Sequence, residues 1–292
     1  MSISDSAGTS GLYYTRRGAG EPLVLIHGLG ASSRIWRPVL ERLSSAREVI
    51  AVDLPGFGRS PPLARAVAPT PKALAESVSA LCLELGIQRP HVAGNSLGGW
   101  VALELGRAEA ASVAAISPAG LWRCPLGPRG LDARRLGRLA KPIVATLLRT
   151  DRGRDVLLRS TAAHPERIPT DEARGLALDW LGARGYDAAD REMRAAVFEH
   201  PEEISVPVTI MPGDRDHLVA PPRTERMPPN AVFVALEDCG HTPTWDDPDL
   251  IADTLIEASS LGGIWAPLAA ESEPGRANAA GDPARGGERS GD

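Results

Sequence analysis

The stretch from His91 to Trp100 carries the serine with the clearest chemical potential in this chain. An apolar run leads into Gly94-Asn95-Ser96-Leu97-Gly98, and a helical pattern follows. Small residues around a serine, at the point where a strand becomes a helix, are typical of a sharp turn that exposes the hydroxyl above a sheet. Side chains at positions 94 and 98 would collide with the neighbouring strand and helix. Ser96 is therefore a candidate nucleophile.

Two later segments supply acids and a histidine at the ends of expected strands. Asp214 and Asp216 follow a strand that ends at Met211, and His241 follows a strand that ends near Leu236. A serine hydroxyl is a poor nucleophile near neutral pH, so it needs a base within reach and a third group that orients the base. The order serine, aspartate, histidine is the one expected for serine hydrolases built on a parallel sheet.

Buried strands and helices alternate along the chain, and they would position these residues. Continuous apolar runs at 23–26, 49–52 and 113–116 are typical of strands buried on both faces. Helical patterns lie between them, so the predicted fold class is α/β, with a doubly wound, mostly parallel sheet. Reactive groups in such a sheet lie beyond the carboxyl ends of the strands, where Ser96 and His241 would meet.

The alternation of strands and helices breaks after Gly120 and resumes at Val206. The intervening pattern is helical, and we expect an inserted cap over the carboxyl edge of the sheet. After Ser260 the composition turns to Gly, Ala, Arg, Glu and Pro, which predicts disorder. The expected division is a loose N-terminus, a core domain in two parts, a helical cap between them and a disordered tail: residues 1–10, 11–120 with 206–260, 121–205 and 261–292.

Composition limits the classes of binding partner and the cellular compartment that we expect for this protein. A net charge of -5 gives no reason to expect a nucleic acid or an anionic membrane as a partner. The 3 cysteines are widely spaced and form no metal-ligand pattern, and their odd number fits a reduced compartment. Neither a secretory signal pattern nor a bilayer-spanning apolar run is present, so a cytoplasmic protein with a small-molecule substrate is expected. The sequence does not indicate the oligomeric state.

Four motifs, in the right order, give the chain a resemblance to a known family. They are His27 to Gly30, Asp53 to Ser60, Gly94 to Gly98, and the pair of Asp216 with His241. Together they resemble the α/β-hydrolase fold family, in its branch with a helical cap, over residues 12–260. The resemblance implies a serine hydrolase without cofactor or metal. It would cleave a small to medium ester, lactone or related acyl compound through an acyl-enzyme.

The resemblance also assigns roles to three side chains. Ser96 becomes the nucleophile, and His241 becomes the general base and then the acid that protonates the leaving group. The family pattern Gly-x-x-Asp followed by an apolar segment fits Gly213 to Asp216, so Asp216 is favoured as the group that orients His241. We expect Asp214 to hydrogen-bond its own turn instead.

Backbone groups and aromatic side chains complete the expected site. The N–H groups of Leu29 and Leu97 would form the oxyanion hole, because Leu97 begins a helix and Leu29 follows the His-Gly pair that donates in the family. Tryptophans next to the motifs are candidates for lining the substrate pocket: Trp36, Trp100, Trp122 and Trp245.

Several alternatives stay open. The segment Gly94 to Gly99 is similar to the subgroup that hydrolyses esters or carbon–carbon bonds of vinylogous diketones, and the same residues would serve that reaction. A cofactor-free haloperoxidase-like side activity and a non-enzymatic role as a ligand-binding or accessory protein are further readings. Ser96 disfavours haloalkane dehalogenases and epoxide hydrolases, whose nucleophile is an aspartate.

Overall fold

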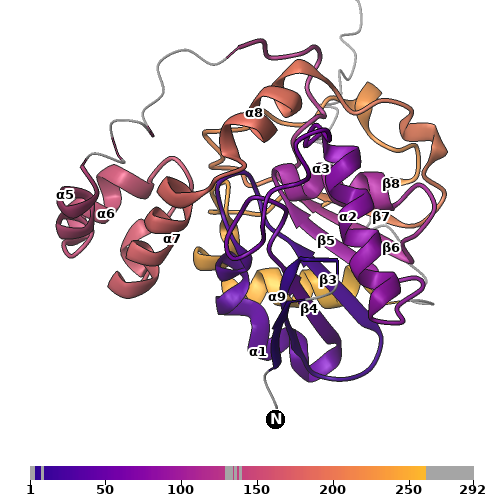
Figure 1. Ribbon diagram of the computed structural model, residues 1–292, viewed down its shortest axis with the longest axis horizontal. Helices are drawn as coiled ribbons and strands as arrows, with labels where there is room; N and C mark the ends of the chain where they lie inside the picture. Colours follow the sequence, from indigo (N-terminus) through magenta and orange to yellow (C-terminus); the bar gives the residue numbers. More distant parts are fainter. Residues whose placement is uncertain (1–3, 8–9, 129–133, 135–136, 138–139, 261–292) are drawn as a thin grey trace, which may run out of the picture.

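One twisted sheet organises the chain (Figure 1). The computed structural model describes residues 4–7, 10–128, 134, 137 and 140–260. Within these residues the strand order is β1-β2-β4-β3-β5-β6-β7-β8, antiparallel at the β1–β2 and β2–β4 pairs and parallel from β4 to β8. The predicted mostly parallel α/β sheet is confirmed. The strands are β1 (Ser4–Ala7), β2 (Tyr13–Arg17), β3 (Pro22–Ile26), β4 (Glu48–Val52), β5 (His91–Asn95), β6 (Ser112–Ile116), β7 (Val208–Met211) and β8 (Ala231–Phe233).

Helices lie on both faces of the sheet. The α-helices are α1 (Arg37–Ala46), α2 (Pro71–Glu84), α3 (Leu97–Leu105), α5 (Lys141–Leu147), α6 (Asp151–Leu158), α7 (Thr170–Gly182), α8 (Tyr186–Ala195) and α9 (Pro248–Ala258). Short 3-10 helices are η1 (Ser33–Trp36), η2 (Pro165–Arg167), η3 (Pro201–Glu203), η4 (Thr224–Arg226) and η5 (Pro243–Trp245). Helices α1 and α9 cover one face, and α2 and α3 cover the other.

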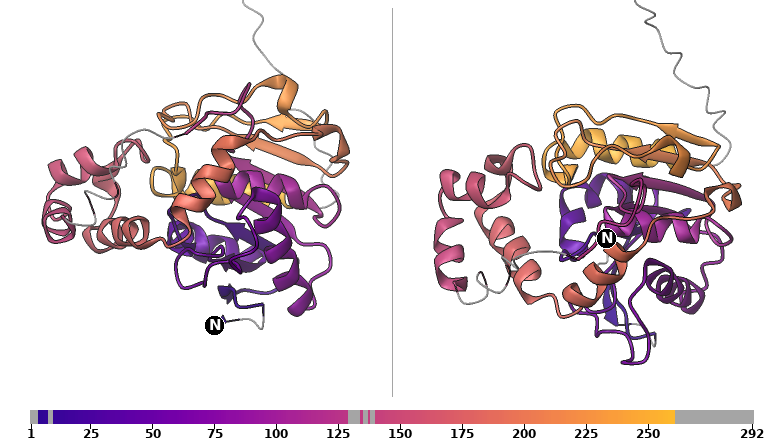
Figure 2. Two further views of the ribbon diagram at one scale, coloured as in Figure 1. Left: turned by 45° about the horizontal axis from the view of Figure 1, so that its top comes forward. Right: turned by 90° about the horizontal axis from the view of Figure 1, so that it is seen from above.

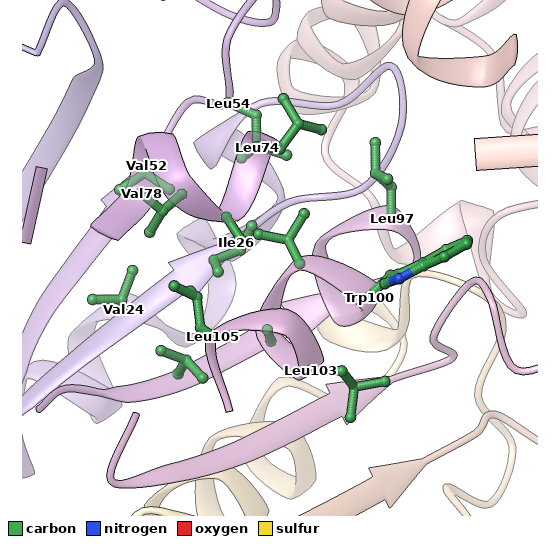
Figure 3. Packing of buried hydrophobic residues seen from close by; sticks show 14 of the residues in the cluster. Val24, Ile26, Val52, Leu54, Leu74, Val78, Leu97, Trp100, Leu103 and Leu105 are labelled. Atoms are coloured by element: carbon green, nitrogen blue, oxygen red, sulfur yellow. The ribbon is translucent and has the colours of Figure 1, made fainter. Parts of the chain in front are cut away.

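The continuous apolar runs follow from this arrangement. On β3, Leu23 and Leu25 pack against α1 and α9, whereas Val24 and Ile26 pack against α2 and α3 (Figure 3). Successive side chains of a strand point to opposite faces, so a strand covered on both faces must be apolar at every position. This is the physical basis on which the sequence predicted the core.

The N-terminus departs from the expectation that residues 1–10 are loose. Ser4–Ala7 forms β1, which pairs antiparallel with β2, with Ser4 opposite Arg16 and Ala7 opposite Tyr13. Without β1, the outer side of β2 would present a row of unpaired N–H and C=O groups, and the N-terminal segment satisfies them. The pairing needs no apolar side chains, which is why the polar sequence did not predict it.

Between β6 and β7, the described residues contain helices and no strand. Helices α5, α6 and α7 form a lobe that projects from one side of the core (Figures 1 and 2). A small apolar cluster of Leu148, Leu158, Ala162, Ile168 and Ala173 holds the lobe together. The helical pattern expected for residues 121–205 is present in the described part of that range, and its role as a cap stays a prediction.

The predicted tail at 261–292 lies outside the described residues. Across the described ranges, every helix is too short or too polar to pass through a lipid bilayer.

Candidate active site

Ser96 occupies the turn between β5, which ends at Asn95, and α3, which begins at Leu97. Its backbone lies at φ 58° and ψ -117°, a conformation that residues other than glycine rarely adopt. Tertiary hydrogen bonds hold it there, because the Ser96 N–H donates to the Ile116 carbonyl and the Ser96 carbonyl accepts from Ala119. A strained serine fixed by its surroundings is typical of functional turns.

Two glycines make this turn sterically possible. A Cβ added at Gly94 would lie 2.0 Å from the Gly98 carbonyl oxygen, and one added at Gly98 would lie 2.2 Å from the Ile26 carbonyl oxygen. Backbone atoms cannot yield at such distances, so the close packing of β5, α3 and β3 requires glycine at both positions. The collision that the sequence predicted at positions 94 and 98 is confirmed.

His241 and Asp216 meet across two loops at the same edge. The Nδ1 atom of His241 lies 2.8 Å from Oδ2 of Asp216, and both side chains are buried. The other oxygen of Asp216 accepts the N–H groups of Leu218 and Val219. Burial opposes ionisation of Asp216, but the His241 hydrogen bond and these N–H groups outweigh it and lower the pKa of the carboxyl. Asp216 is therefore a carboxylate that accepts from Nδ1 of His241 and leaves Nε2 available.

Asp214 has a different partner from the one the sequence suggested. We expected it to bond its own turn, but its Oδ1 accepts the N–H of Cys239 at 3.1 Å. A parallel bridge between Gly213 and Leu236 brings the two loops together, so the Cys239 N–H of the loop that carries His241 lies within reach of the Asp214 carboxylate. Asp214 thus supports that loop from outside.

Asn95 joins the Ser96 turn to the His241 turn. Its side-chain amide donates to the His241 carbonyl at 2.7 Å and to the Ile116 carbonyl at 3.3 Å. Among the described residues, Ser96 Oγ makes no hydrogen bond with the His241 ring, so the two turns are linked through Asn95. Catalytic hydrogen bonds are often long before a substrate is bound.

The loop after β3 lies against the Ser96 turn. A Cβ at Gly28 would come within 3.1 Å of the Ser96 Cβ, so the backbone of Gly28 and Leu29 passes directly beside Ser96. Within the described residues, the N–H groups of Leu29 and Leu97 have no hydrogen-bond acceptor. Two free N–H groups beside a strained serine could bind a developing oxyanion.

His27 braces this loop. Its Nε2 accepts the Leu54 N–H at 2.9 Å, so Nδ1 carries the proton and donates to the Gly28 carbonyl at 2.8 Å. Burial lowers the pKa of His27, which keeps the ring neutral and able to accept from Leu54. Helices α7 and α8 cover the loop from above, since a Cβ at Gly30 would meet Trp180 and Tyr186.

The four tryptophans lie in three different environments. Trp36 has no exposed surface and belongs to the core cluster of α1 and α9, so it offers no face to a ligand in this structure. Trp100 and Trp122 contact each other edge to face, with ring centroids 5.9 Å apart. Trp245 packs against the apolar cluster of the α5–α7 lobe. A pocket role for Trp100, Trp122 and Trp245 stays a prediction.

The two buried cysteines, Cys82 and Cys239, do not offer a rival nucleophile. Burial raises the pKa of Cys82 to about 12, and burial together with neighbouring carboxylates raises the pKa of Cys239 to about 12. Both thiols are therefore protonated at neutral pH, and it is the thiolate that reacts.

Sequence reasoning did not assign roles to several residues that contact the site. Asn95 stands beside the serine, and its identity alone could have suggested a hydrogen-bonding role. Asp246, which accepts the Gly240 N–H, lies in the acidic pair before α9 and carries no distinguishing signal. Trp180 and Tyr186 come from the helical region, and their positions depend on how that region folds back.

Comparisons with a family model and with known proteins show what this chain is similar to. A family model described as "Alpha/beta hydrolase family" matches residues 23–254. The chain is 31% identical over 238 residues to the dihydrolipoyllysine-residue acetyltransferase component of an acetoin cleaving system from Cupriavidus necator, covering 78% of this chain and 61% of that protein. It therefore spans less than two thirds of this relative. It is also 28% identical over 196 residues to an epoxide hydrolase of Mycobacterium tuberculosis, covering 62% of this chain and 91% of the relative.

Solved structures show the same architecture. A bacterial membrane phospholipase A, described as a virulence factor, superposes with a TM-score of 0.67 at 26% identity, covering 87% of this chain and 84% of that structure. The family model, which matches residues 23–254, spans the parallel part of the sheet from Leu23 in β3 through β8, the Ser96 turn and the loops that carry Asp216 and His241. The chain belongs to the alpha/beta hydrolase family.

Proposed function

We propose that the protein is a serine hydrolase that cleaves a small to medium carboxylic ester or lactone through an acyl-enzyme. One observation carries the proposal. The strained Ser96 lies at the sheet edge where the buried His241 is hydrogen-bonded to Asp216. This combination supplies a nucleophile, a base and an orienting carboxylate in one place.

The reaction would begin with attack of Ser96 Oγ on the substrate carbonyl carbon. Nε2 of His241 takes the hydroxyl proton, and Asp216 holds the ring in the required tautomer and stabilises the imidazolium. The N–H groups of Leu29 and Leu97 stabilise the oxyanion. The carbonyl then re-forms, and His241 returns the proton to the departing alcohol oxygen. Water, deprotonated by His241, cleaves the acyl-enzyme and releases the acid.

Ser96 also argues against an epoxide substrate, although one relative is an epoxide hydrolase. Opening an epoxide with a serine would leave an alkyl ether, which has no carbonyl for water to attack. A carboxylate nucleophile leaves an ester, and that can be hydrolysed.

The test measures hydrolysis of p-nitrophenyl esters of increasing chain length, together with labelling by a fluorophosphonate probe. Ser96→Ala should abolish labelling and lower kcat by about 10⁴-fold or more. Ser117→Ala is the matched control, because Ser117 is also buried with a positive φ of 43°, and it should retain labelling. Labelling that survives in Ser96→Ala, or a wild-type chain that neither labels nor turns over, would overturn the proposal.

A dienone substrate of the vinylogous diketone type belongs in the same screen, because the segment from Gly94 to Gly99 resembles that subgroup. Cleavage of its carbon–carbon bond with little ester turnover would replace the ester assignment while leaving the roles of Ser96 and His241 in place.

A further inference from the structure

The turn that carries His241 is held from two sides. On the side of the Ser96 turn, Asn95 donates to the His241 carbonyl. On the opposite side, the N–H of Thr242 donates to the Thr161 carbonyl at 2.7 Å, and the N–H of Gly240 donates to Oδ2 of Asp246 at 2.8 Å. Both neighbours of His241 are therefore bound through groups that lie outside the sheet.

Asp246 connects the His241 turn to the segment 161–164 between α6 and α7. The residue is 2% exposed. Besides the Gly240 N–H, its Oδ2 accepts the Ala163 N–H at 3.1 Å, and its Oδ1 accepts the His164 N–H at 2.8 Å. One buried carboxylate thus satisfies three backbone donors on two separate segments.

Steric fit makes this connection close. A Cβ at Gly240 would lie 2.7 Å from the Ala163 nitrogen and 2.8 Å from the Ala162 carbonyl carbon, so the two turns touch backbone to backbone. The Arg167 guanidinium binds the Asp246 carbonyl at 2.6 Å, and the preceding Trp245 packs against the apolar cluster of the α5–α7 lobe. Segment 161–164 therefore cannot shift without moving Gly240 or breaking these bonds.

We propose that Asp246 is a positioning residue for His241. It binds segment 161–164 to the His241 turn and so keeps the imidazole aligned with Asp216. The inference rests on the proposed function in taking His241 as the base. It also means that segment 161–164 stays with the core, so any opening of the helical region for a substrate occurs elsewhere.

The chemistry of the three donors explains why a carboxylate stands here. All three partners are N–H groups, and a carboxylate offers only acceptors. Hydrogen bonds to an ionised acceptor are shorter and stronger than neutral ones. An amide in its place would keep one acceptor oxygen but would present an NH₂ group to N–H donors, which leaves buried donors unpaired.

The test compares Asp246→Ala and Asp246→Asn with Asp247→Ala. The neighbouring Asp247 also accepts a backbone N–H, that of Leu250 at the start of α9, at 2.9 Å. All three variants should lower the Tm. Only the Asp246 variants should lower kcat, by about 10- to 100-fold, with KM changed less than about twofold, because they misplace the base without touching the bound substrate.

A second readout does not depend on activity. The chain has 6 histidines, so ¹⁵N-histidine labelling gives a simple spectrum in which a His241→Gln variant assigns the His241 signals. The Nδ1–H proton bonded to Asp216 should resonate far downfield in the wild type and in Asp247→Ala, and should shift or broaden in folded Asp246→Asn.

The outcomes separate the two proposals. If the wild type hydrolyses no ester or dienone, the proposed function fails, and the His241 spectrum still tests the positioning role. If the wild type is active and Asp246→Asn keeps both wild-type kcat and the downfield signal, Asp246 is only structural and the inference is wrong. Should Asp246→Ala fail to fold, Asp246→Asn carries the comparison.

Discussion

The turns that carry Ser96 and His241 lie at the same edge of the sheet but are held in different ways. The Ser96 turn is fixed by the close packing of β5, α3 and β3, which Gly94 and Gly98 allow. The His241 turn is fixed by hydrogen bonds to Asn95 and to segment 161–164, which lie far away in sequence, and to Asp246, which lies only a few residues further along the chain. The geometry of the Ser96 turn is thus built into the core, whereas the geometry of the His241 turn depends partly on the helical region.

Because the two turns are held differently, structural perturbations of the helical region and of the core should affect them differently. A perturbation of the helical region should leave the Ser96 turn intact and disturb His241. A perturbation of the Ser96 turn disturbs the sheet itself, because the same glycines pack two strands and a helix together. Variants in the two turns should therefore separate loss of folding from loss of turnover.

Gly98→Ala should have the largest effect on stability. Its Cβ would lie 2.2 Å from the Ile26 carbonyl oxygen, so α3 must move away from β3, at a cost of about 3 kcal/mol or more. Urea unfolding measures the change. Gly182→Ala at the end of α7 is the control, because nothing lies within 4 Å of the added Cβ, and its stability should be unchanged or slightly raised. Equal stability of the two variants would contradict the steric account of the Ser96 turn.

The largest effect on turnover without loss of the fold should come from Asp216→Ala. Removing the carboxylate that accepts from His241 Nδ1 frees the ring to adopt the wrong tautomer, and kcat should fall by about 10³- to 10⁴-fold. Asp214→Ala loses only a hydrogen bond to Cys239 and should cost about 1 kcal/mol of stability, with kcat lowered less than about tenfold. Steady-state kinetics on a p-nitrophenyl ester decide between them, and the reverse ranking would exchange the two roles.

Gly240→Ala should lower kcat less than Asp216→Ala does, and unlike Gly98→Ala it should leave the core folded. Its added Cβ would meet the backbone of Ala162 and Ala163 rather than the sheet, so the His241 turn and segment 161–164 would separate while the core stays folded. We expect kcat to fall about 10- to 100-fold. Circular dichroism and fluorophosphonate labelling should show a folded protein with a slowly reacting Ser96. A variant that unfolds as readily as Gly98→Ala would mean that the two turns are equally part of the core.

The same contrast explains what could be predicted from the sequence. The buried strands and the Ser96 turn depend on local patterns, so apolar runs and two glycines were sufficient to place them. The pairing of His241 with Asp216 rather than Asp214 followed from a family pattern, because both carboxylates stand in one loop. Strand β1 was not predicted, since backbone pairing along β2 needs no particular side chains.

Contacts that cross between the core and the helical region could not be predicted. Trp36 and Trp245 both stand beside a motif, yet one packs under α1 and α9 and the other against the α5–α7 lobe. The environment of each tryptophan depends on how the helices pack against the sheet and against each other, and the spacing of apolar residues in the sequence does not determine this packing. The role of Asp246 could not be predicted for the same reason, because two of its three hydrogen-bond donors belong to segment 161–164.

The smallest expected effect concerns pH and the loop beside Ser96. Burial lowers the pKa of His27 in the folded protein. Below about pH 6.5 the imidazole is therefore protonated in the unfolded chain while it stays neutral in the folded chain. Stability should therefore decrease from about pH 6.5 downward, with His27 contributing up to about 1.4 kcal/mol per pH unit until its folded-state pKa is reached. In His27→Gln the slope of unfolding free energy against pH should become shallower, as measured by urea unfolding between pH 5.5 and 7.5.

His91→Gln provides the comparison for that slope. Burial also lowers the pKa of His91, but a protonated His91 would face the Glu21 carboxylate 3.7 Å from its Nε2, whereas a protonated His27 would lose its hydrogen bond from the Leu54 N–H. Removing the His91 imidazole should therefore change the slope less. His91 lies at the opposite end of β5 from Ser96, where protonation would not reach the oxyanion loop. An equal or larger change in His91→Gln would mean that acid weakens the sheet as a whole rather than the loop that His27 braces.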